Sequence, residues 1–206
     1  MADILQNSVK KNLAMAKNSV EVEIKIPVSK KLFEKVKRSL KGEAKLVSVS
    51  RDIDKYFNAP HRNFLEKTPI EEFLRVRIKK DFTFFTYKHG YWNKKLEHTH
   101  SDEFETKIES SEQLEKILNV LDFKNILQID KEREVYQVSG GFEISFDKVK
   151  DLGYFIEIES NRSFGSINKT MGAIYALARS IGLDPTKRDS MGYVSLMLER
   201  KKLFGR

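Results

Sequence analysis

The segment EVEIK, which begins at Glu21, alternates charged and aliphatic side chains. In an extended strand, Glu21, Glu23 and Lys25 fall on one face, and Val22 and Ile24 fall on the other. Carboxylates are hard oxygen ligands that suit a divalent metal ion, and an ammonium group binds phosphate oxygens. The segment therefore predicts a β-strand whose charged face is either solvated or part of a binding site.

The same pattern recurs in other candidate strands, and the charges are sorted by sign. The recurring pairs are Glu103 and Glu105, Glu157 and Glu159, Arg75 and Arg77, and Lys131 and Arg133. A further strand carries Asp147 on the face that it shares with Glu143 and Ser145. Ordinary solvation would explain any one of these strands, because protein surfaces are usually charged. A solvated sheet would mix its polar side chains freely, so the sorting favours faces that serve one site.

A sheet that closes on itself would turn these faces toward an enclosed lumen. A closed antiparallel barrel has no edge strands, and a sufficiently large one encloses a polar interior. A lumen with both signs of charge suits a ligand that also carries both, such as a metal–triphosphate complex. Without a ligand, buried charges would repel one another and lose favourable hydration. We therefore expect the empty lumen to hold water.

Six motifs, in order along the chain, resemble those of the CYTH proteins. This superfamily, also called the triphosphate tunnel metalloenzymes, includes class IV adenylate cyclases and thiamine triphosphatases. The first three motifs are EVEIK, similar to the family's Glu-x-Glu-x-Lys, FLRVRIKK, similar to its Leu-Arg-x-Arg strand, and FTYK, similar to the strand with a tunnel lysine. The other three are DEFETKI, DKEREVY and FDKVKDLGYFIEIES, which resemble its central acidic strand, its Lys-x-Arg-x-x-Tyr strand and its closing strands. The resemblance runs from about Val20 to Glu159, and six ordered motifs are far more specific than one.

The resemblance implies an α+β fold, a closed eight-stranded antiparallel β-barrel with helices packed outside, and it implies roles for individual residues. Residues expected to act in catalysis are Glu21, Glu23 and Lys25. One or two divalent metal ions, Mg²⁺ or Mn²⁺, would be held by Glu21, Glu23, Asp147, Glu157 and Glu159. The phosphate chain would be held by Lys25, Arg75, Arg77, Lys88, Lys131 and Arg133. Glu103 and Glu105 would either bind metal or orient these cations, and Asp54 and Tyr56 are interpreted mainly as architecture.

Two reactions fit such a tunnel. A triphosphate carries roughly four negative charges, and more charge builds on the leaving group as a P–O bond breaks. Metals and fixed cations stabilise that charge. Attack of the ribose 3′-oxygen of ATP on the α-phosphorus gives cyclic AMP and pyrophosphate, whereas attack of water on the terminal phosphorus gives hydrolysis. The closing motif LGYFIEIES and the general run of motifs most resemble class IV adenylate cyclases, and this resemblance narrowly favours the cyclase.

Two alternatives to the cyclase stay open. One is a triphosphatase that acts on inorganic triphosphate or on a nucleoside or thiamine triphosphate. The other is a non-catalytic protein that binds polyphosphate or RNA 5′ ends. The carboxylate pairs disfavour the second alternative, because they would repel a bare phosphate chain.

Composition narrows the class of partner. The 206 residues carry a formal net charge of +8, which favours an anionic partner. We expect this to be a small molecule that contains a triphosphate, with no membrane partner and with nucleic acid disfavoured. The absence of cysteine excludes disulfides and thiolate zinc sites and fits a cytoplasmic location. The oligomeric state is left open, a homodimer included.

Residues 19–206 are expected to form a single tunnel domain, preceded by a mobile extension over residues 1–18. Predicted helices span 30–40 with Ser29 as cap and 110–123, and two more follow Asn168 with a break near 182–188. Predicted strands span 45–57, 72–80, 82–88, 103–109, 126–138, 142–149 and 152–160. Residues 89–102, which include His98 and His100, are expected to form an exposed loop that binds no metal.

Overall fold

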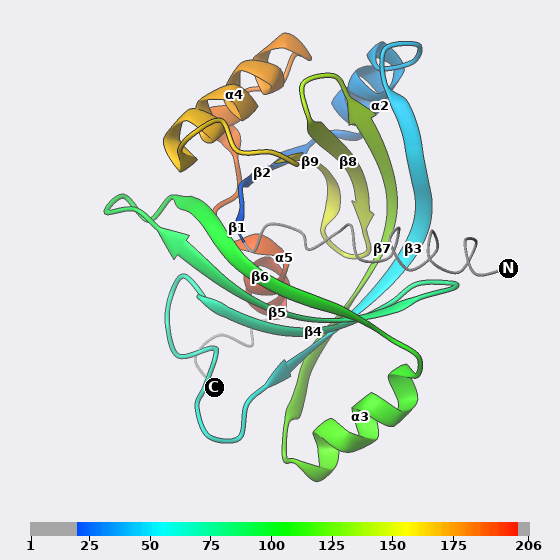
Figure 1. Ribbon diagram of the computed structural model, residues 1–206, viewed down its shortest axis with the longest axis vertical. Coiled ribbons are helices and arrows are strands. Elements are labelled where there is room, and N and C mark those ends of the chain that lie inside the picture. The colour runs from blue at the N-terminus through cyan, green and yellow to red at the C-terminus, as the bar shows by residue number, and fades with distance from the viewer. Residues whose placement is uncertain (1–19, 202–206) are drawn as a thin grey trace, which may run out of the picture.

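Nine antiparallel strands form one strongly curved sheet in the computed structural model, which describes residues 20–201 (Figure 1). The extension predicted for residues 1–18 lies outside the described residues. The strands are β1 (Val20–Glu21), β2 (Glu23–Val28), β3 (Lys45–Asn58), β4 (Glu72–Ile78), β5 (Thr83–Trp92), β6 (His98–Ile108), β7 (Lys124–Val138), β8 (Phe142–Val149) and β9 (Gly153–Ser160). Their order across the sheet is β1-β6-β5-β4-β3-β7-β8-β9-β2.

The two edges of this sheet are consecutive pieces of the chain. β1 pairs with β6 and β2 pairs with β9, and only Val22 separates β1 from β2. One extended segment therefore passes from one edge of the sheet to the other and closes the barrel. The predicted barrel is confirmed, with nine strands instead of eight because this first segment is divided at Val22.

Between residues 20 and 201, four α-helices accompany the barrel: α2 (Lys30–Ser39), α3 (Ser111–Val120), α4 (Ile167–Ser180) and α5 (Gly192–Arg200). Ser29 and Ser110 cap α2 and α3, each accepting a hydrogen bond from a backbone N–H of the first turn. The predicted break between the last two helices contains a short 3₁₀ helix, η1 (Pro185–Lys187). Within residues 20–201, no helix has the length and apolar character needed to cross a membrane.

The aliphatic faces of the strands point outward, where helices cover them. Ile24, Ile144 and Ile158 are fully or almost fully buried in a cluster that also contains residues of α2 and α4. A second outer cluster joins Leu118 of α3 to Val76 of β4 and its neighbours. Because side chains alternate along a strand, this outward packing turns the charged faces into the barrel.

The last helix, α5, has a different place from the other three. Its residues Tyr193, Val194 and Met197 pack against Ile129 and Phe155, which lie on β7 and β9. In Figure 1, α5 lies at the centre of the view with strands around it. It therefore provides an apolar plug at one end of the barrel and limits the polar lumen on that side.

The structure corrects the prediction of an exposed loop at residues 89–102. β5 continues through Trp92 and β6 begins at His98, so that only residues 93–97 form a turn. The Asn93 side chain holds this turn by accepting hydrogen bonds from the N–H groups of Lys95 and Glu97. The lysines and glycine of this stretch suggest a loop, whereas pairing with the facing strand keeps both segments extended.

Candidate active site

A cavity inside the barrel contains the charged residues predicted from the sequence. Of the thirteen predicted site residues, all except Asp147 line it. Asp147 is fully buried behind the cavity wall. The structure thus brings residues that are far apart in the chain, such as Glu21 and Glu159, into one space.

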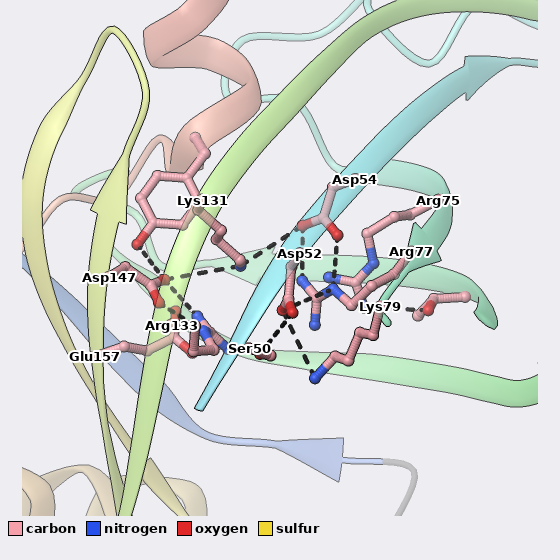
Figure 2. Close-up of polar contacts among 12 residues, drawn as sticks. Ser50, Asp52, Asp54, Arg75, Arg77, Lys79, Lys131, Arg133, Asp147 and Glu157 are labelled. Carbon is pink, nitrogen blue, oxygen red and sulfur yellow. Dashed lines mark hydrogen bonds and ion pairs between the residues drawn. The ribbon is translucent and has the colours of Figure 1, made fainter. Parts of the chain in front are cut away.

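One side of the cavity forms what we call the cationic wall, made of Arg75, Arg77, Lys131 and Arg133 from β4 and β7 (Figure 2). Three of these cations, Arg77, Lys131 and Arg133, are held from behind by buried carboxylates. Asp54 accepts two hydrogen bonds from Arg77, at 2.6 and 2.8 Å. These fork-like contacts fix the direction of the guanidinium plane.

Asp147 supports the same wall from β8. It accepts two hydrogen bonds from Arg133, both 2.6 Å, and a third of 2.8 Å from the Tyr193 hydroxyl. Lys131 lies between the two buried carboxylates, with its Nζ 3.6 Å from Asp54 Oδ2 and 3.7 Å from Asp147 Oδ2. In this arrangement the oxygens of Asp147 are directed at protein cations.

Lys131 has an unusual charge environment. Burial and the neighbouring Arg133 and Arg77 guanidinium groups lower the pKa of Lys131 to about 8, despite the two carboxylates. The carboxyl pKa of Asp54 moves the other way: burial would raise it, but Arg77 and Lys131 hold it below its ordinary value. The cationic wall is therefore charged at neutral pH, and Lys131 is the member that is easiest to deprotonate.

The opposite side of the cavity, which we call the acidic wall, comes from β9, β2, β1, β6 and β5. It carries six carboxylates and two lysines, namely Glu21, Glu23, Glu103, Glu105, Glu157, Glu159, Lys25 and Lys88. Lys88 forms ion pairs with Glu21, with Glu23 at 3.2 Å and with Glu103 at 3.8 Å. Three carboxylates from three strands thus converge on one ammonium group.

Lys25 pairs within the acidic wall, whereas Arg75 connects the two walls, as does Arg133 through a 3.1 Å hydrogen bond to Glu157. Lys25 Nζ lies 3.1 Å from Glu157 Oε2 and 4.3 Å from the centre of the Tyr193 ring. Burial would lower the pKa of Lys25, but Glu157 and Glu23 outweigh it and raise the pKa above its ordinary value. Arg75 donates to Glu105 at 3.2 Å and to Thr86 at 3.1 Å. Lys25 is therefore an ammonium group at neutral pH, suited to holding anions.

The charges in the cavity are balanced by one another. Besides the two walls, Arg188 and Asp189 also line the cavity, so its lining holds seven Lys or Arg side chains and seven carboxylates. Charges buried without a ligand would be expected to repel one another. The structure instead shows cations and carboxylates in mutual ion pairs, which a ligand would have to rearrange.

The donor set of the acidic wall fits a hard divalent cation. Glu23 and Glu159 are direct register partners on β2 and β9, and both line the cavity. Carboxylates placed opposite each other repel unless a cation lies near them, and Mg²⁺ and Mn²⁺ prefer oxygen ligands of this kind. Within residues 20–201, no three acidic or histidine side chains are already arranged around a common metal position. Binding would require these carboxylates to turn from lysine toward the ion.

Several cavity residues were not predicted from the sequence. They include Trp92 and His98 from the β5–β6 hairpin and the segment from Arg188 to Tyr193 before and within α5. The backbone N–H of Asp189 donates to the carbonyl of Lys25 at 2.7 Å, and Arg188 donates to the carbonyl of His98 at 2.9 Å. The segment thereby joins β2 to β6. Its sequence, RDSMGY, has no local pattern that reveals this position.

Comparisons with known proteins agree with the fold and with the motifs. A family model described as the CYTH domain matches residues 19–193. A Methanocaldococcus jannaschii protein named "Putative adenylate cyclase MJ0240" is 37% identical over 150 residues, which are 73% of this chain and 79% of that protein. The PH1819 protein of Pyrococcus horikoshii has a similar structure, with a TM-score of 0.75 and 30% identity over 87% of this chain and 99% of its own.

A more distant structure is from Hippeastrum, with a TM-score of 0.59 and 14% identity over 89% of this chain and 95% of its own. Its published description is a "Putative adenylyl cyclase HpAC1" that "reveals a dominant triphophatase activity". At this identity the likeness concerns the fold alone. The family model covers most of the described chain, and the protein therefore belongs to the CYTH domain family.

Proposed function

We propose that this protein is an enzyme that acts on triphosphate substrates with the help of Mg²⁺ or Mn²⁺. The observation that carries the proposal is the division of one cavity into two walls. Four cations, three of them held in place by buried carboxylates, face a wall on which six carboxylates surround two lysines. A metal–triphosphate complex carries the matching charges, because its phosphates suit the first wall and its metal ions suit the second.

The cationic wall is built to hold phosphate oxygens without moving. Arg77 and Arg133 each use Nε and Nη2 to contact a buried aspartate, and Arg133 Nη2 also donates to Glu157 at 3.1 Å. The Nη1 group of each arginine is then the part that would bind the ligand. Fixed cations stabilise the negative charge that develops as a P–O bond breaks, at no cost in reorganisation during the reaction. Lys25, which stays protonated, would act from the opposite side in the same way.

The acidic wall would hold one or two metal ions through Glu21, Glu23, Glu157 and Glu159. Glu103 lies close to Lys88, the lysine that Glu21 and Glu23 also contact. A bound divalent ion would neutralise phosphate charge and polarise the oxygen that attacks phosphorus. We assign Asp147 a positioning role, because its oxygens already hold Arg133, Lys131 and Tyr193. Glu105 would orient Arg75, since the two are paired.

Conversion of ATP to cyclic AMP and pyrophosphate is the reaction we favour. The relative with 37% identity carries the name of an adenylate cyclase, and the closing motif over residues 152–160 resembles that class. Hydrolysis of a triphosphate is the alternative, because the same walls would stabilise attack by water on the terminal phosphorus. The Hippeastrum protein, whose description names a triphosphatase activity, shows that both names occur within this fold.

Product analysis decides between these reactions. The purified chain is incubated with ATP and, separately, with inorganic triphosphate, each with Mg²⁺ or Mn²⁺, and the products are separated chromatographically. Cyclic AMP together with pyrophosphate is the expected result with ATP. Orthophosphate with ADP or pyrophosphate would make the protein a triphosphatase, and no product with any metal would favour a non-catalytic phosphate-binding protein.

A further inference from the structure

The cavity contains an aromatic surface that phosphate chemistry does not require. Trp92 of β5 and His98 of β6 both line it, with their rings 5.2 Å apart and inclined at 69°. We call this pair the aromatic shelf. The phosphate and metal ligands described above are all charged side chains, so the shelf has no part in holding them.

A β-bulge places the two rings on the cavity side. Tyr91 pairs with His100, but the next residue, Trp92, pairs with His98, so Thr99 is the extra residue. In a regular ladder the partner of Trp92 would be Thr99, but the bulge makes His98 its partner. Tyr91 and His100 stack on the opposite face of the hairpin at 4.5 Å. One hairpin therefore carries an inner and an outer aromatic pair.

The indole of Trp92 is held at a fixed position. Its N–H donates to the carbonyl of Ser190 at 3.1 Å. The ring lies so close to Gly90 that a Cβ there would come within 2.4 Å of it, so only glycine leaves room for this orientation. His98 is held in turn by a 2.9 Å contact between its Nε2 and Ser101 Oγ. Burial, followed by the nearby Lys88, lowers the pKa of His98 to about 4, which keeps the imidazole neutral at physiological pH.

The shelf lies on the same face of β5 as the charged site. Lys88, Gly90 and Trp92 occupy alternate positions of the strand and all line the cavity. Four residues of extended chain separate the Cα atoms of Lys88 and Trp92 by about 13 Å. That separation suits a ligand that has phosphates at one end and a flat organic group at the other.

We propose that the aromatic shelf binds the base of a nucleoside triphosphate, so that the substrate of this site is a nucleotide and not inorganic triphosphate. This inference rests on the proposed function of the charged walls. Base stacking on an aromatic side chain commonly changes affinity by roughly 5- to 150-fold. Inorganic triphosphate has no group that could gain from an uncharged aromatic surface.

The protein offers a direct optical test, because Trp92 is its single tryptophan. Indole fluorescence of the full chain is excited at the red edge of its absorption band during titration with ATP, or with inorganic triphosphate, in the presence of Mg²⁺. We expect ATP to quench or shift the emission and inorganic triphosphate to change it much less. Equal changes with both ligands, or none with ATP at a concentration shown by calorimetry to saturate the protein, would overturn the proposal.

Kinetics with a matched pair of variants provides the second test. Trp92→Ala should raise the KM for ATP at least fivefold and leave the Kd for inorganic triphosphate, measured by calorimetry, unchanged. Tyr91→Ala, which removes the outer aromatic residue of the same hairpin, should change neither. A rise in both constants in Trp92→Ala would mean that the indole only supports the structure of the walls. No rise in the KM for ATP would exclude base stacking.

The two proposals fail in different ways. If the chain turns over no substrate, the proposed enzymatic function fails, while the fluorescence titration still reports whether a base reaches Trp92. If turnover of inorganic triphosphate is efficient and ATP neither changes the fluorescence nor reacts, the charged walls function as proposed and the shelf proposal is wrong.

Discussion

The cationic and acidic walls of the cavity hold their charges in different ways. On the cationic wall, Arg77 and Arg133 each make two short hydrogen bonds to a fully buried carboxylate. On the acidic wall, Glu21, Glu23 and Glu103 share the ammonium group of Lys88, a point charge on a flexible stem. The first arrangement is rigid and the second is exchangeable. We infer that the cationic wall is formed by folding, whereas the acidic wall is completed by its ligand.

The largest expected effect comes from removing a carboxylate behind the cationic wall. Asp147→Ala leaves Arg133 without its bidentate partner and deprives Lys131 and Tyr193 of a shared acceptor. Breaking a buried pair in this way typically costs about 3–5 kcal/mol of unfolding free energy. Denaturation with urea, followed by circular dichroism, measures this loss.

An exposed pair of the same chemistry provides the control. Arg51 makes two hydrogen bonds to Asp130 between β3 and β7, but 69% of the Arg51 side chain is exposed. Asp130→Ala should therefore destabilise the protein much less than Asp147→Ala. Equal losses of unfolding free energy in the two variants would show that the buried pairs of the cationic wall are no stronger than an exposed pair.

Substitutions in the acidic wall should lower the activity of the protein far more than its stability. In the double variant Glu21→Gln with Glu23→Gln, amides replace two proposed metal ligands, and Lys88 keeps Glu103 as a partner. We expect turnover to fall at least about 100-fold, on the scale of removing a group that stabilises transition-state charge. The loss of unfolding free energy should be smaller than that of Asp147→Ala, because water in the cavity can solvate Lys88.

Activity and denaturation measured on the same preparation test this contrast. Glu132→Gln, which removes a partner of Lys148 on the exposed side of β7, is the control and should alter neither property. Unchanged turnover in the double variant would remove Glu21 and Glu23 from the site.

The affinity of the cationic wall for phosphate groups should depend on pH because Lys131 titrates. Its ammonium is protonated below the pKa of about 8 and loses its positive charge above it. Metal-free binding of inorganic triphosphate should therefore weaken above pH 8, by up to roughly tenfold per pH unit for one linked proton. The affinity falls, and does not rise, with increasing pH because a deprotonated lysine no longer attracts phosphate.

Lys131→Arg separates this effect from titration of the ligand, because arginine keeps its charge over the same range. Calorimetric titrations of the wild type and the variant are compared from pH 7 to pH 10. The wild-type affinity should fall relative to that of the variant as the pH rises. Parallel profiles would assign the pH dependence to the ligand or to another group.

The alternation of charged and apolar residues along single strands made the charged lumen predictable. Which residues face each other on neighbouring strands could be predicted only in part. The partnership of Arg133 with Asp147 follows from the β7–β8 hairpin, whose short turn at Gly140 fixes the register. Arg77 also faces Asp54 directly, but a long connection separates β3 from β4, and local sequence does not set that register. The interpretation of Asp54 as architecture is consistent with its role behind Arg77.

The hairpin and the C-terminal segment show where local patterns mislead. The stretch after Lys88 resembles a loop in composition, yet cross-strand pairing and stacking of Tyr91 on His100 extend both strands. Residues 188–193 reach the cavity only because α5 packs into the end of the barrel. Such positions depend on tertiary packing, and no periodicity in the sequence reports them.

The smallest predicted effect tests how α5 supports the cationic wall. Tyr193→Phe removes the hydroxyl that donates to Asp147 and keeps the ring that lies beside Lys25 and Lys131. Because Asp147 retains Arg133 and Lys131 as partners, the loss of unfolding free energy should be about 1 kcal/mol, a typical value for one hydrogen bond.

Tyr136→Phe is the matched control, since the Tyr136 hydroxyl donates at 3.1 Å to Glu134 outside the cavity. Turnover should fall slightly in Tyr193→Phe and stay unchanged in Tyr136→Phe. A fall in turnover as large as that of the Glu21 and Glu23 variant would mean that the hydroxyl itself contacts the substrate. The plug formed by α5 would then be part of the reacting site. The cavity would have a third functional surface, on α5, beside the wall formed by folding and the wall completed by its ligand.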